Sequence, residues 1–378
     1  MSSKEDTEQH LTLEELREVI RAEQQPDLER CTVAEGIDMY LSEKSDEYRE
    51  TTAQQYRSSL GFFQIWCHSN EIKNLNDLSA RQLKEYKNWR RDEATTKVKS
   101  LSKSTLKSQM DILRCFLRFC ETFDAVEPGL NEAVPSIELK SGEDVRNEAL
   151  DSKRARDIRN YLSKFKYASR EHVVWVLFTE TGVRVSGLHS LDVEDFYPSA
   201  EIPHLCLCHR PETDTRLKNG SDGHRKIGLR EKSCEILEDY IKDTRIDVEG
   251  QYGRNPLVTS HEGRVSRSTI RKYVYMWTRP CAIGKECPHE VDPNECDAIN
   301  NNSAYECPSS KSAHTIRRGY ITHKLNSDVN PTDLSGRVDT SVEVLKEHYD
   351  ARTETEKMEV RQRIFDASRL NHDDYGGE

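Results

Sequence analysis

Helix-start signals repeat through the first third of the chain and restrict what this part can fold into. Four Ser or Thr residues stand three positions before a Glu or Gln, each just ahead of regularly spaced apolar residues. This pattern is the capping box, in which the two side chains satisfy backbone N–H groups where a helix begins. We therefore predict several helices before residue 126. The boxes are Thr12–Glu15, Thr32–Glu35, Thr52–Gln55 and Ser79–Gln82.

The apolar residues that follow these boxes recur at helical spacing. After Thr52 they are four, three and three positions apart, and a last helix starting near Ser104 continues the pattern. Such a stripe is one face of a helix, and several stripes predict a shared core. The first of these stripes is Tyr56, Leu60, Phe63 and Trp66.

Positive charge is concentrated in one segment, although the net charge of the 378-residue chain is −11. Residues 81–120 carry eleven Lys/Arg against four Asp/Glu, whereas residues 1–30 carry four against nine. A local basic patch on helices indicates a nucleic-acid interface, and a solvated helix face is the alternative interpretation. The side chains expected to face DNA are Lys97, Lys99, Lys103, Lys107, Arg114 and Arg118, with Lys84, Lys87, Arg90 and Arg91 beside them.

Pro and Gly mark a change of organisation after residue 125. Residues 126–146 lack periodicity and contain Pro128, Gly129, Pro135 and Gly142, so we expect an interdomain linker there. We expect an acidic extension at 1–30, a helical domain at 31–125 and a larger domain at 147–378. The N-terminus is polar and no apolar run approaches the ~18 residues of a membrane span, so we expect a cytoplasmic protein without membrane contact.

The larger domain is expected to be mainly helical with a small antiparallel sheet. Residues 203–209 alternate like a strand, and residues 213–218 and 224–229 flank the turn-forming Asn219–Gly223 as in a hairpin. Periodic segments predict the helices, which are 150–163, 170–180, 231–244, 267–277, 313–326, 341–350 and 353–368.

Four residues of this domain suit chemistry on a phosphodiester. His314 and Arg317 are one helical turn apart, Arg184 follows a glycine turn, and Tyr349 comes late in the chain. Arginine donates two hydrogen bonds to a phosphate and stays protonated. Histidine transfers protons near neutral pH, and tyrosine can form a covalent ester.

The segments Thr181–Leu191 and Ser312–Tyr320, together with the late Tyr349, resemble the tyrosine recombinase (phage integrase) family over about residues 31–370. The resemblance is Xer-like and looks closest to archaeal members, including haloarchaeal ones or their viruses and plasmids. It implies a helical SAM-like DNA-binding domain followed by the family's mixed catalytic fold. The implied catalytic set is Arg184, Lys218, His314, Arg317, Arg337 and Tyr349, with Lys226 as a weaker candidate for the lysine.

The resemblance implies a site-specific recombinase that cuts and rejoins DNA through a 3′-phosphotyrosine without a catalytic cofactor. It implies a clamp around double-stranded DNA, a homotetramer on two DNA sites, and a monomer or dimer off DNA. The C-terminal segment 352–378, amphipathic through Met358, Ile364 and Phe365, would dock on a neighbouring protomer or on its own domain. A type IB topoisomerase-like relaxing enzyme and a catalytically silent DNA-binding relative remain the alternatives.

Four cysteines cluster in the insertion 278–312, just before His314. Their spacing lacks a Cys-x2-Cys knuckle, but four thiolates could hold a structural zinc and fix the loop. His289 is an alternate ligand, and an acidic insertion with free thiols is the other interpretation. The four cysteines are Cys281, Cys287, Cys296 and Cys307.

Overall fold

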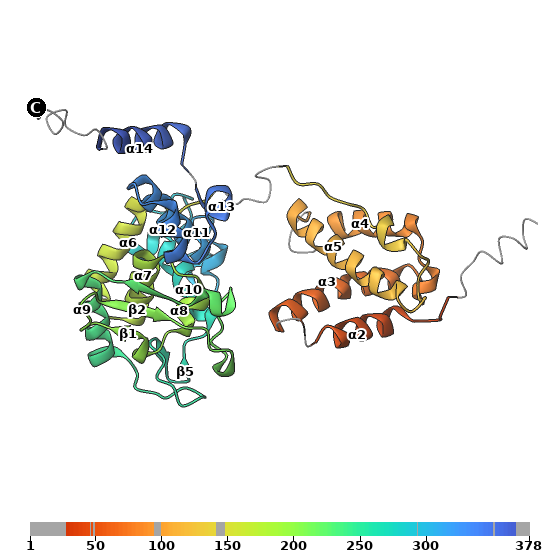
Figure 1. Cartoon of the computed structure of the whole chain (residues 1–378), viewed down its shortest axis with the longest axis horizontal. Coiled ribbons are helices and arrows are strands. Elements are labelled where there is room, and N and C mark those ends of the chain that lie inside the picture. Colours follow the sequence, from red (N-terminus) through yellow and green to blue (C-terminus); the bar gives the residue numbers. More distant parts are fainter. Residues whose placement is uncertain are drawn as a thin grey trace, which may run out of the picture. The chain divides into compact units, whose positions relative to one another are not determined.

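The chain forms two compact units, Met1–Asp144 and Val145–Glu378, in a computed structural model (Figure 1). Each unit has a hydrophobic core of its own and is described separately here. The structure describes residues 28–45, 47, 50–93, 100–140, 148–292, 294–350 and 352–367, without the side chains of Thr51 and His348.

The first unit is a helical bundle. Thr32 and Ser79 form the predicted capping boxes, each with its side chain bonded to the backbone of the third helical residue. The predicted box at Thr52 is wrong, because that helix begins two residues earlier, at Glu50. The box at Thr12 lies outside the described residues. The helices are α2 (Val33–Glu43), α3 (Glu50–Ser69), α4 (Ala80–Asp92) and α5 (Lys103–Glu121).

Aromatic side chains fill the core of this bundle. The rings of Phe63 on α3 and Tyr86 on α4 meet edge to face with their centroids 5.1 Å apart. The first part of the expected linker also belongs to this core, because Val126, Leu130 and Val134 are buried in it. The segment up to that point therefore packs on the first unit.

The second unit is built around α7 (Arg170–Thr181), whose buried residues lie on every side of the helix. A helix that is apolar all round is central in its domain. Five helices pack against it: α6 (Ser152–Phe165), α8 (Val185–Ser190), α9 (Glu231–Asp239), α10 (Arg267–Thr278) and α11 (Ala313–Asn326). The chain then continues through α12 (Pro331–Val338), α13 (Val342–Val344) and α14 (Glu354–Ala367), and π-helical turns lie at Tyr240–Thr244 and Leu345–Tyr349.

The sheet of the second unit is small and antiparallel, as expected. Its strands run in the order β1 (Phe196–Tyr197), β2 (His204–Leu207), β3 (Arg225–Gly228), and Leu205 pairs with Ile227. A separate hairpin joins β4 (Thr259–Ser260) and β5 (Gly263–Arg264). The predicted hairpin arm at 213–218 is wrong, because β3 pairs with β2 instead. Residues 210–223 form the long turn between β2 and β3, and it includes two short 3-10 helices.

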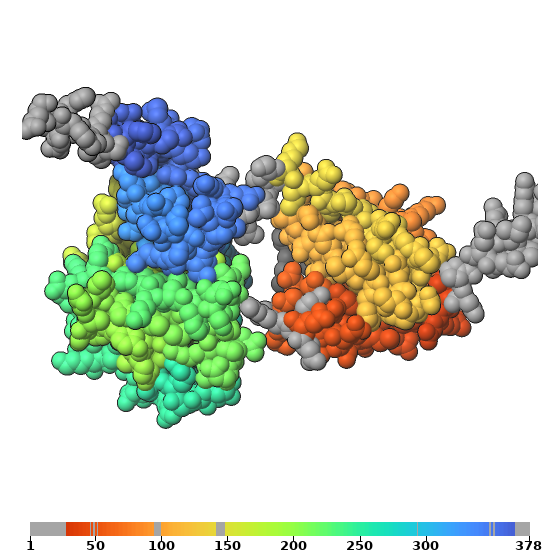
Figure 2. Space-filling model, in the orientation of Figure 1, coloured from red at the N-terminus to blue at the C-terminus, as the bar shows by residue number. Residues whose placement is uncertain are grey.

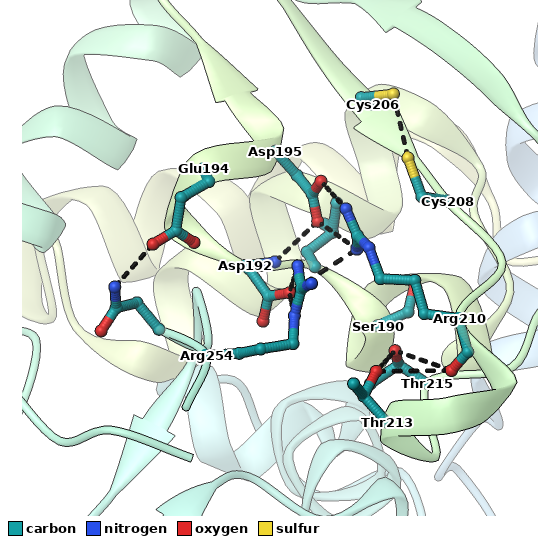
Figure 3. Close-up of polar contacts among 12 residues, drawn as sticks. Ser190, Asp192, Glu194, Asp195, Cys206, Cys208, Arg210, Thr213, Thr215 and Arg254 are labelled. Atoms are coloured by element: carbon teal, nitrogen blue, oxygen red, sulfur yellow. Dashed lines mark hydrogen bonds and ion pairs between the residues drawn. The ribbon is translucent and has the colours of Figure 1, made fainter. Parts of the chain in front are cut away.

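A buried ion-pair network fixes the start of this long turn and the end of α8 (Figure 3). Asp192 has no exposed surface and forms ion pairs with Arg254 and Arg264. Asp195 accepts from the Nη1 of Arg210 at 2.9 Å. The carbonyl of Arg210 accepts from the backbone N–H of Thr215 at 3.1 Å. The turn therefore leaves β2 from an anchored position.

The C-terminal helix α14 lies against the neighbouring C-terminal elements of its own unit (Figure 2). Val360 is buried, and Arg363 binds the Asp328 carboxylate at 3.0 Å. Three apolar side chains of the helix stay exposed, namely Met358, Ile364 and Phe365. In the described part of the chain, the helices are too short or too polar to cross a membrane.

Candidate active site

Helix α11 carries the predicted His314 and Arg317 into the interior of the second unit. Ser312 caps the helix and places His314 in its first turn. The Arg317 side chain is almost fully buried, at 1% exposure. Its Nη1 donates to the Gly182 carbonyl at 2.8 Å and its Nη2 to the Val338 carbonyl at 2.6 Å. The guanidinium plane is therefore fixed by the backbone of two other elements.

The turn that precedes Arg184 depends on glycine. Gly182 ends α7 with φ 63°, and a Cβ there would lie 2.3 Å from the Tyr320 ring. Glycine alone combines that backbone conformation with so close an approach. Arg184 follows as the N-cap residue of α8. Its Nη1 donates to Asp339 Oδ2 and its Nη2 to Thr340 Oγ1, both at 2.8 Å.

Thr340 joins the two arginines. Its Oγ1 accepts from Arg184 and also from the Nη2 of Arg317. The hydroxyl therefore fixes the spacing between the two guanidinium groups.

Tyr349 lies beside these groups at the end of the π-helical turn. Its ring centroid is 5.1 Å from that of His314, and the Arg317 guanidinium carbon is 5.3 Å from the Tyr349 ring centroid. The Thr322 hydroxyl donates to the Tyr349 carbonyl at 3.0 Å. The π-helical turn and this hydrogen bond bring the tyrosine against α11.

One cleft of about 350 Å³ brings together five of the six predicted catalytic residues. Lys218 joins them from the long turn after β2. Among the described residues, no Asp or Glu side chain lines the cleft, whereas Arg and Lys side chains are abundant there. The cleft therefore suits an anion. The residues concerned are Arg184, Lys218, His314, Arg317 and Tyr349, with Arg267, Arg271 and Tyr275 along one side.

Burial sets the protonation of two of these groups. Burial and then the nearby Arg317 lower the pKa of His314 below its usual value, so the imidazole is neutral at pH 7 and can accept a proton. Burial, with the Arg184 charge second, lowers the pKa of Arg317 to about 10. Arg317 is therefore still a cation at neutral pH.

Arg337, the sixth predicted residue, lies elsewhere. Its guanidinium donates to the Tyr320 hydroxyl at 2.8 Å and to the carbonyls of Gly228 and Glu180 at 3.0 and 3.1 Å. These contacts tie α12 to α11, β3 and α7, and they point the group away from the cleft. Lys226 is exposed on β3 and is not among the cleft residues either.

The sequence interpretation missed five residues at or behind the cleft. Arg267, Arg271 and Tyr275 are spaced by four and share one face of α10, a signal that periodicity could have revealed. Asp339 and Thr340 carried no such signal, because their role depends on the turn that ends α12.

The basic surface of the first unit is partly engaged in internal contacts. Lys107 and Arg114 both bind Asp111, at 2.6 and 2.7 Å. Arg118 and Lys103 are exposed, whereas Lys97 and Lys99 lie outside the described residues. Arg90 differs from the expectation, because it is buried with its guanidinium carbon 3.7 Å from the Phe62 ring centroid.

The described residues of the cysteine-rich insertion do not gather into a metal site. Cys281, Cys287, Cys296 and Cys307 are free and half-buried, and no group of three or more potential ligands forms among the described residues. His289 instead hydrogen-bonds the Ser309 hydroxyl at 2.8 Å. A structural zinc at these four cysteines stays a prediction.

Arg279 holds part of the insertion through hydrogen bonds. Its buried guanidinium donates to the carbonyls of Ala298 and Ile299 and to Asn301 Oδ1, the last two at 3.0 Å. The Nη2 of Arg154 donates to the Ser309 carbonyl at 2.7 Å. These bonds satisfy backbone groups that a long loop would otherwise leave unpaired.

No protein-family model and no curated protein matches this sequence. Among solved structures, a lambda integrase dimer bound to a core site is 14% identical, with a TM-score of 0.57, over 94% of this chain and 82% of that one. The Tn1549 transposon integrase with transposon right-end DNA is 15% identical, with a TM-score of 0.58, over 88% of this chain and 99% of that one. The fold is that of these integrases.

A third similar structure is a lambda integrase tetramer on a Holliday junction, with 13% identity and a TM-score of 0.59 over 90% of this chain and 86% of that one. The shared integrase fold therefore covers most of this chain and most of each of the three similar structures. It confirms the expected class of a helical domain followed by a mainly helical domain with a small antiparallel sheet.

Proposed function

We propose that this protein is a site-specific DNA recombinase that cleaves and rejoins DNA through a 3′-phosphotyrosine at Tyr349. The observation that carries the proposal is an unpaired hydrogen-bond donor on Arg317. Its Nε is buried and has no hydrogen-bond partner, whereas Nη1 and Nη2 donate to the carbonyls of Gly182 and Val338. A buried unpaired donor in a cationic cleft indicates a missing anionic ligand, and a phosphodiester has the matching charge and oxygens.

The proposed reaction gives one role to each of the five predicted residues in the cleft. The Tyr349 oxygen attacks the phosphorus, a bond forms to the 3′-phosphate, and the bond to the 5′ oxygen breaks. Neutral His314 accepts the tyrosine proton. Arg184 and Arg317 stabilise the charge on the nonbridging oxygens.

Lys218 completes the step by giving a proton to the leaving 5′ oxygen. The energy of the broken bond is kept in the tyrosyl ester, so the reverse reaction with a new 5′ hydroxyl rejoins DNA without ATP. All the groups needed for strand exchange are then side chains of this chain.

The proposed partner is double-stranded DNA with a specific recombination site. The similar structures hold DNA as a core-site dimer, a transposon end and a Holliday-junction tetramer. By the same arrangement, four protomers would act on two sites, with a monomer or dimer off DNA. The exposed apolar side chains of α14 offer a surface for a neighbouring protomer, in addition to the contacts that α14 makes within its own unit.

Lys103 and Arg118 would contact phosphates from the first unit, so binding should weaken steeply as salt rises. This contact supplies register and affinity, whereas the choice of site requires base contacts.

Covalent trapping with DNA from the source organism tests the proposal. The protein is mixed with fragmented DNA and denatured, and the DNA fragments that remain linked to protein are sequenced. Linked fragments that share one sequence would support a site-specific recombinase and would give its target.

Two other outcomes would contradict it. Linked fragments spread evenly over the DNA, with relaxation of any supercoiled plasmid, would indicate a type IB topoisomerase-like enzyme. Tight DNA binding without linked fragments at any salt concentration would indicate a catalytically silent relative.

A further inference from the structure

One carboxylate lies directly behind the cleft. Asp339 Oδ2 accepts from the Nη1 of Arg184 at 2.8 Å, and its Oδ1 accepts from the Nδ2 of Asn219 at 2.8 Å. Arg225 is a more distant partner at 3.8 Å. Asn219 directly follows Lys218, so a single side chain connects the first arginine of the cleft to the turn that carries the lysine.

The backbone around Asp339 is arranged for this contact. Asp339 ends α12 in the left-handed region, with φ 56° and ψ 61°, a conformation that aspartate adopts more readily than most residues. Its side chain is only 11% exposed. The turn also directs the next residue, Thr340, toward the two arginines.

The long turn packs closely against the same carboxylate. A Cβ added to Gly223 would lie 3.4 Å from Asp339 Oδ2 and 3.2 Å from the Leu217 side chain. Residues on both sides of Lys218 are therefore in contact with Asp339 or with each other. This packing is independent of the Asn219 hydrogen bond.

We infer that Asp339 is a positioning residue, which sets Arg184 and the Lys218 turn at a fixed distance from each other. We call the contacts of Asp339 with Arg184 and Asn219 the Asp339 bridge. The inference rests on the proposed function, in which Arg184 binds the phosphate and Lys218 gives a proton to the leaving oxygen. The carboxylate also offsets repulsion among the cleft cations, which have no acidic residue beside them in the described lining.

The opposite role, a carboxylate that occupies Arg184 in place of phosphate and inhibits it, makes a different prediction. Removing an inhibitor would raise the cleavage rate, whereas removing a positioning residue would lower it. Asp339→Asn keeps the size and an acceptor oxygen but loses the charge. Asp333→Asn is the matched control, because Asp333 is exposed on the same helix.

The first measurement is single-turnover cleavage of a nicked DNA site by the full-length protein. We expect Asp339→Asn to cleave about 100-fold more slowly than the wild type, the scale of loss that a small misplacement of a reacting group causes. Asp333→Asn should cleave at the wild-type rate. A rate for Asp339→Asn within twofold of the wild type, or a faster one, would overturn the inference.

The second measurement separates the two ends of the bridge. Asn219→Ala removes the contact to the Lys218 turn and leaves the Arg184 ion pair. A substrate with sulfur at the bridging 5′ position has a leaving group that needs no proton, so it should restore cleavage by Asn219→Ala. It should not restore cleavage by Asp339→Asn, whose arginine is also misplaced. Equal recovery of both variants would contradict the bridge.

The third measurement does not depend on catalysis. Hydrogen exchange of residues 217–223 should be faster in Asp339→Ala and Asn219→Ala than in Asp333→Asn. Unchanged exchange in both would overturn the bridge even if the enzyme is active. Faster exchange in the two variants, together with a wild-type protein that forms no covalent adduct, would keep the bridge and reject the proposed function.

Discussion

At the residue scale, burial decides which form of each titratable side chain the fold holds. His314 is held neutral beside Tyr349, whereas Arg317 stays charged although it is buried. A neutral proton acceptor next to permanent cations is the combination that cleavage by tyrosine requires. The same physical effect acts on a histidine outside the cleft, where it is simpler to measure.

His172 on α7 has no exposed surface, and its Nδ1 accepts from the Ala168 backbone N–H at 3.2 Å. Burial, followed by the charge of Arg159, lowers its pKa to about 4. The unfolded chain binds the proton near pH 6.5, so folding stability falls as the pH drops from there toward 4.

We expect this effect to cost about 2 kcal/mol between pH 7.5 and pH 5. Urea unfolding at both pH values would show it as a steeper loss of stability in the wild type than in His172→Asn, which cannot take up the proton. A parallel loss in the two proteins would mean that His172 is not held neutral.

At the element scale, α11 is fixed on the side away from the cleft as well. The Leu150 N–H donates to the Thr315 carbonyl at 3.0 Å, so the chain that enters the second unit crosses this helix. A Cβ on Gly319 would lie 2.2 Å from the Leu150 carbonyl oxygen. The helix that carries His314 and Arg317 therefore needs a glycine at this crossing.

We expect Gly319→Ala to lower the free energy of unfolding by about 1–3 kcal/mol, since backbone must move to admit the methyl group. Gly336→Ala on α12 is the control, because its Cβ would meet nothing within 4 Å. The control should be neutral or more stable by up to about 1 kcal/mol. Denaturant titration of both variants would decide, and equal stabilities would contradict the close crossing.

The insertion before α11 gives a second prediction at this scale. If Arg279 rather than zinc holds the loop, a strong chelator should leave the unfolding temperature of the wild type unchanged. Arg279→Met should cost about 2 kcal/mol and speed cleavage within 284–306 by a glutamate-specific protease, since buried carbonyls lose their donors. A large fall in the unfolding temperature with chelator would instead support a metal.

The sequence indicated many elements because their signals are local. The helices at 170–180, 267–277 and 313–326 occur within a residue of the predicted positions. The helix α12 was missed, because eight residues are too few to show periodicity. The strand partner of β3 was predicted wrongly, since pairing depends on the tertiary path of the chain and not on the nearest turn.

The site residues that stand in local sequence motifs could be predicted, as the helices with local signals could. Arg184, His314, Arg317 and Tyr349 stand in motifs, and the structure brings them to one cleft with Lys218. The family resemblance implied Arg337 as a site residue, but its side chain is held by three other elements. Only the geometry of the α12 turn shows that Asp339 and Thr340 contact the arginines.

At the scale of the whole molecule, the two units have separate hydrophobic cores. The first is formed around Phe63 and Phe116, and the main core of the second around Trp175 and Phe178. Domains with their own cores can unfold as independent units. The integrase fold is therefore expected to behave as two cooperative units in solution.

Calorimetry of the full chain should show two unfolding transitions. Leu113→Ala in the first core and Leu177→Ala in the second remove matched side chains that are at most 1% exposed. Each should lower one transition only, by about 2–5 kcal/mol of stability. A single transition that both variants lower equally would mean that the units unfold together.

The central claim, that Tyr349 becomes linked to DNA, is most directly tested by peptide mapping of the trapped adduct. The protein would be stopped on a nicked substrate, digested with nuclease and protease, and analysed by mass spectrometry. We predict one modified peptide that contains Tyr349 and carries nucleotide through its phenolic oxygen, and its loss in Tyr349→Phe. Nucleotide on any other residue, or an adduct that persists in Tyr349→Phe, would contradict the account.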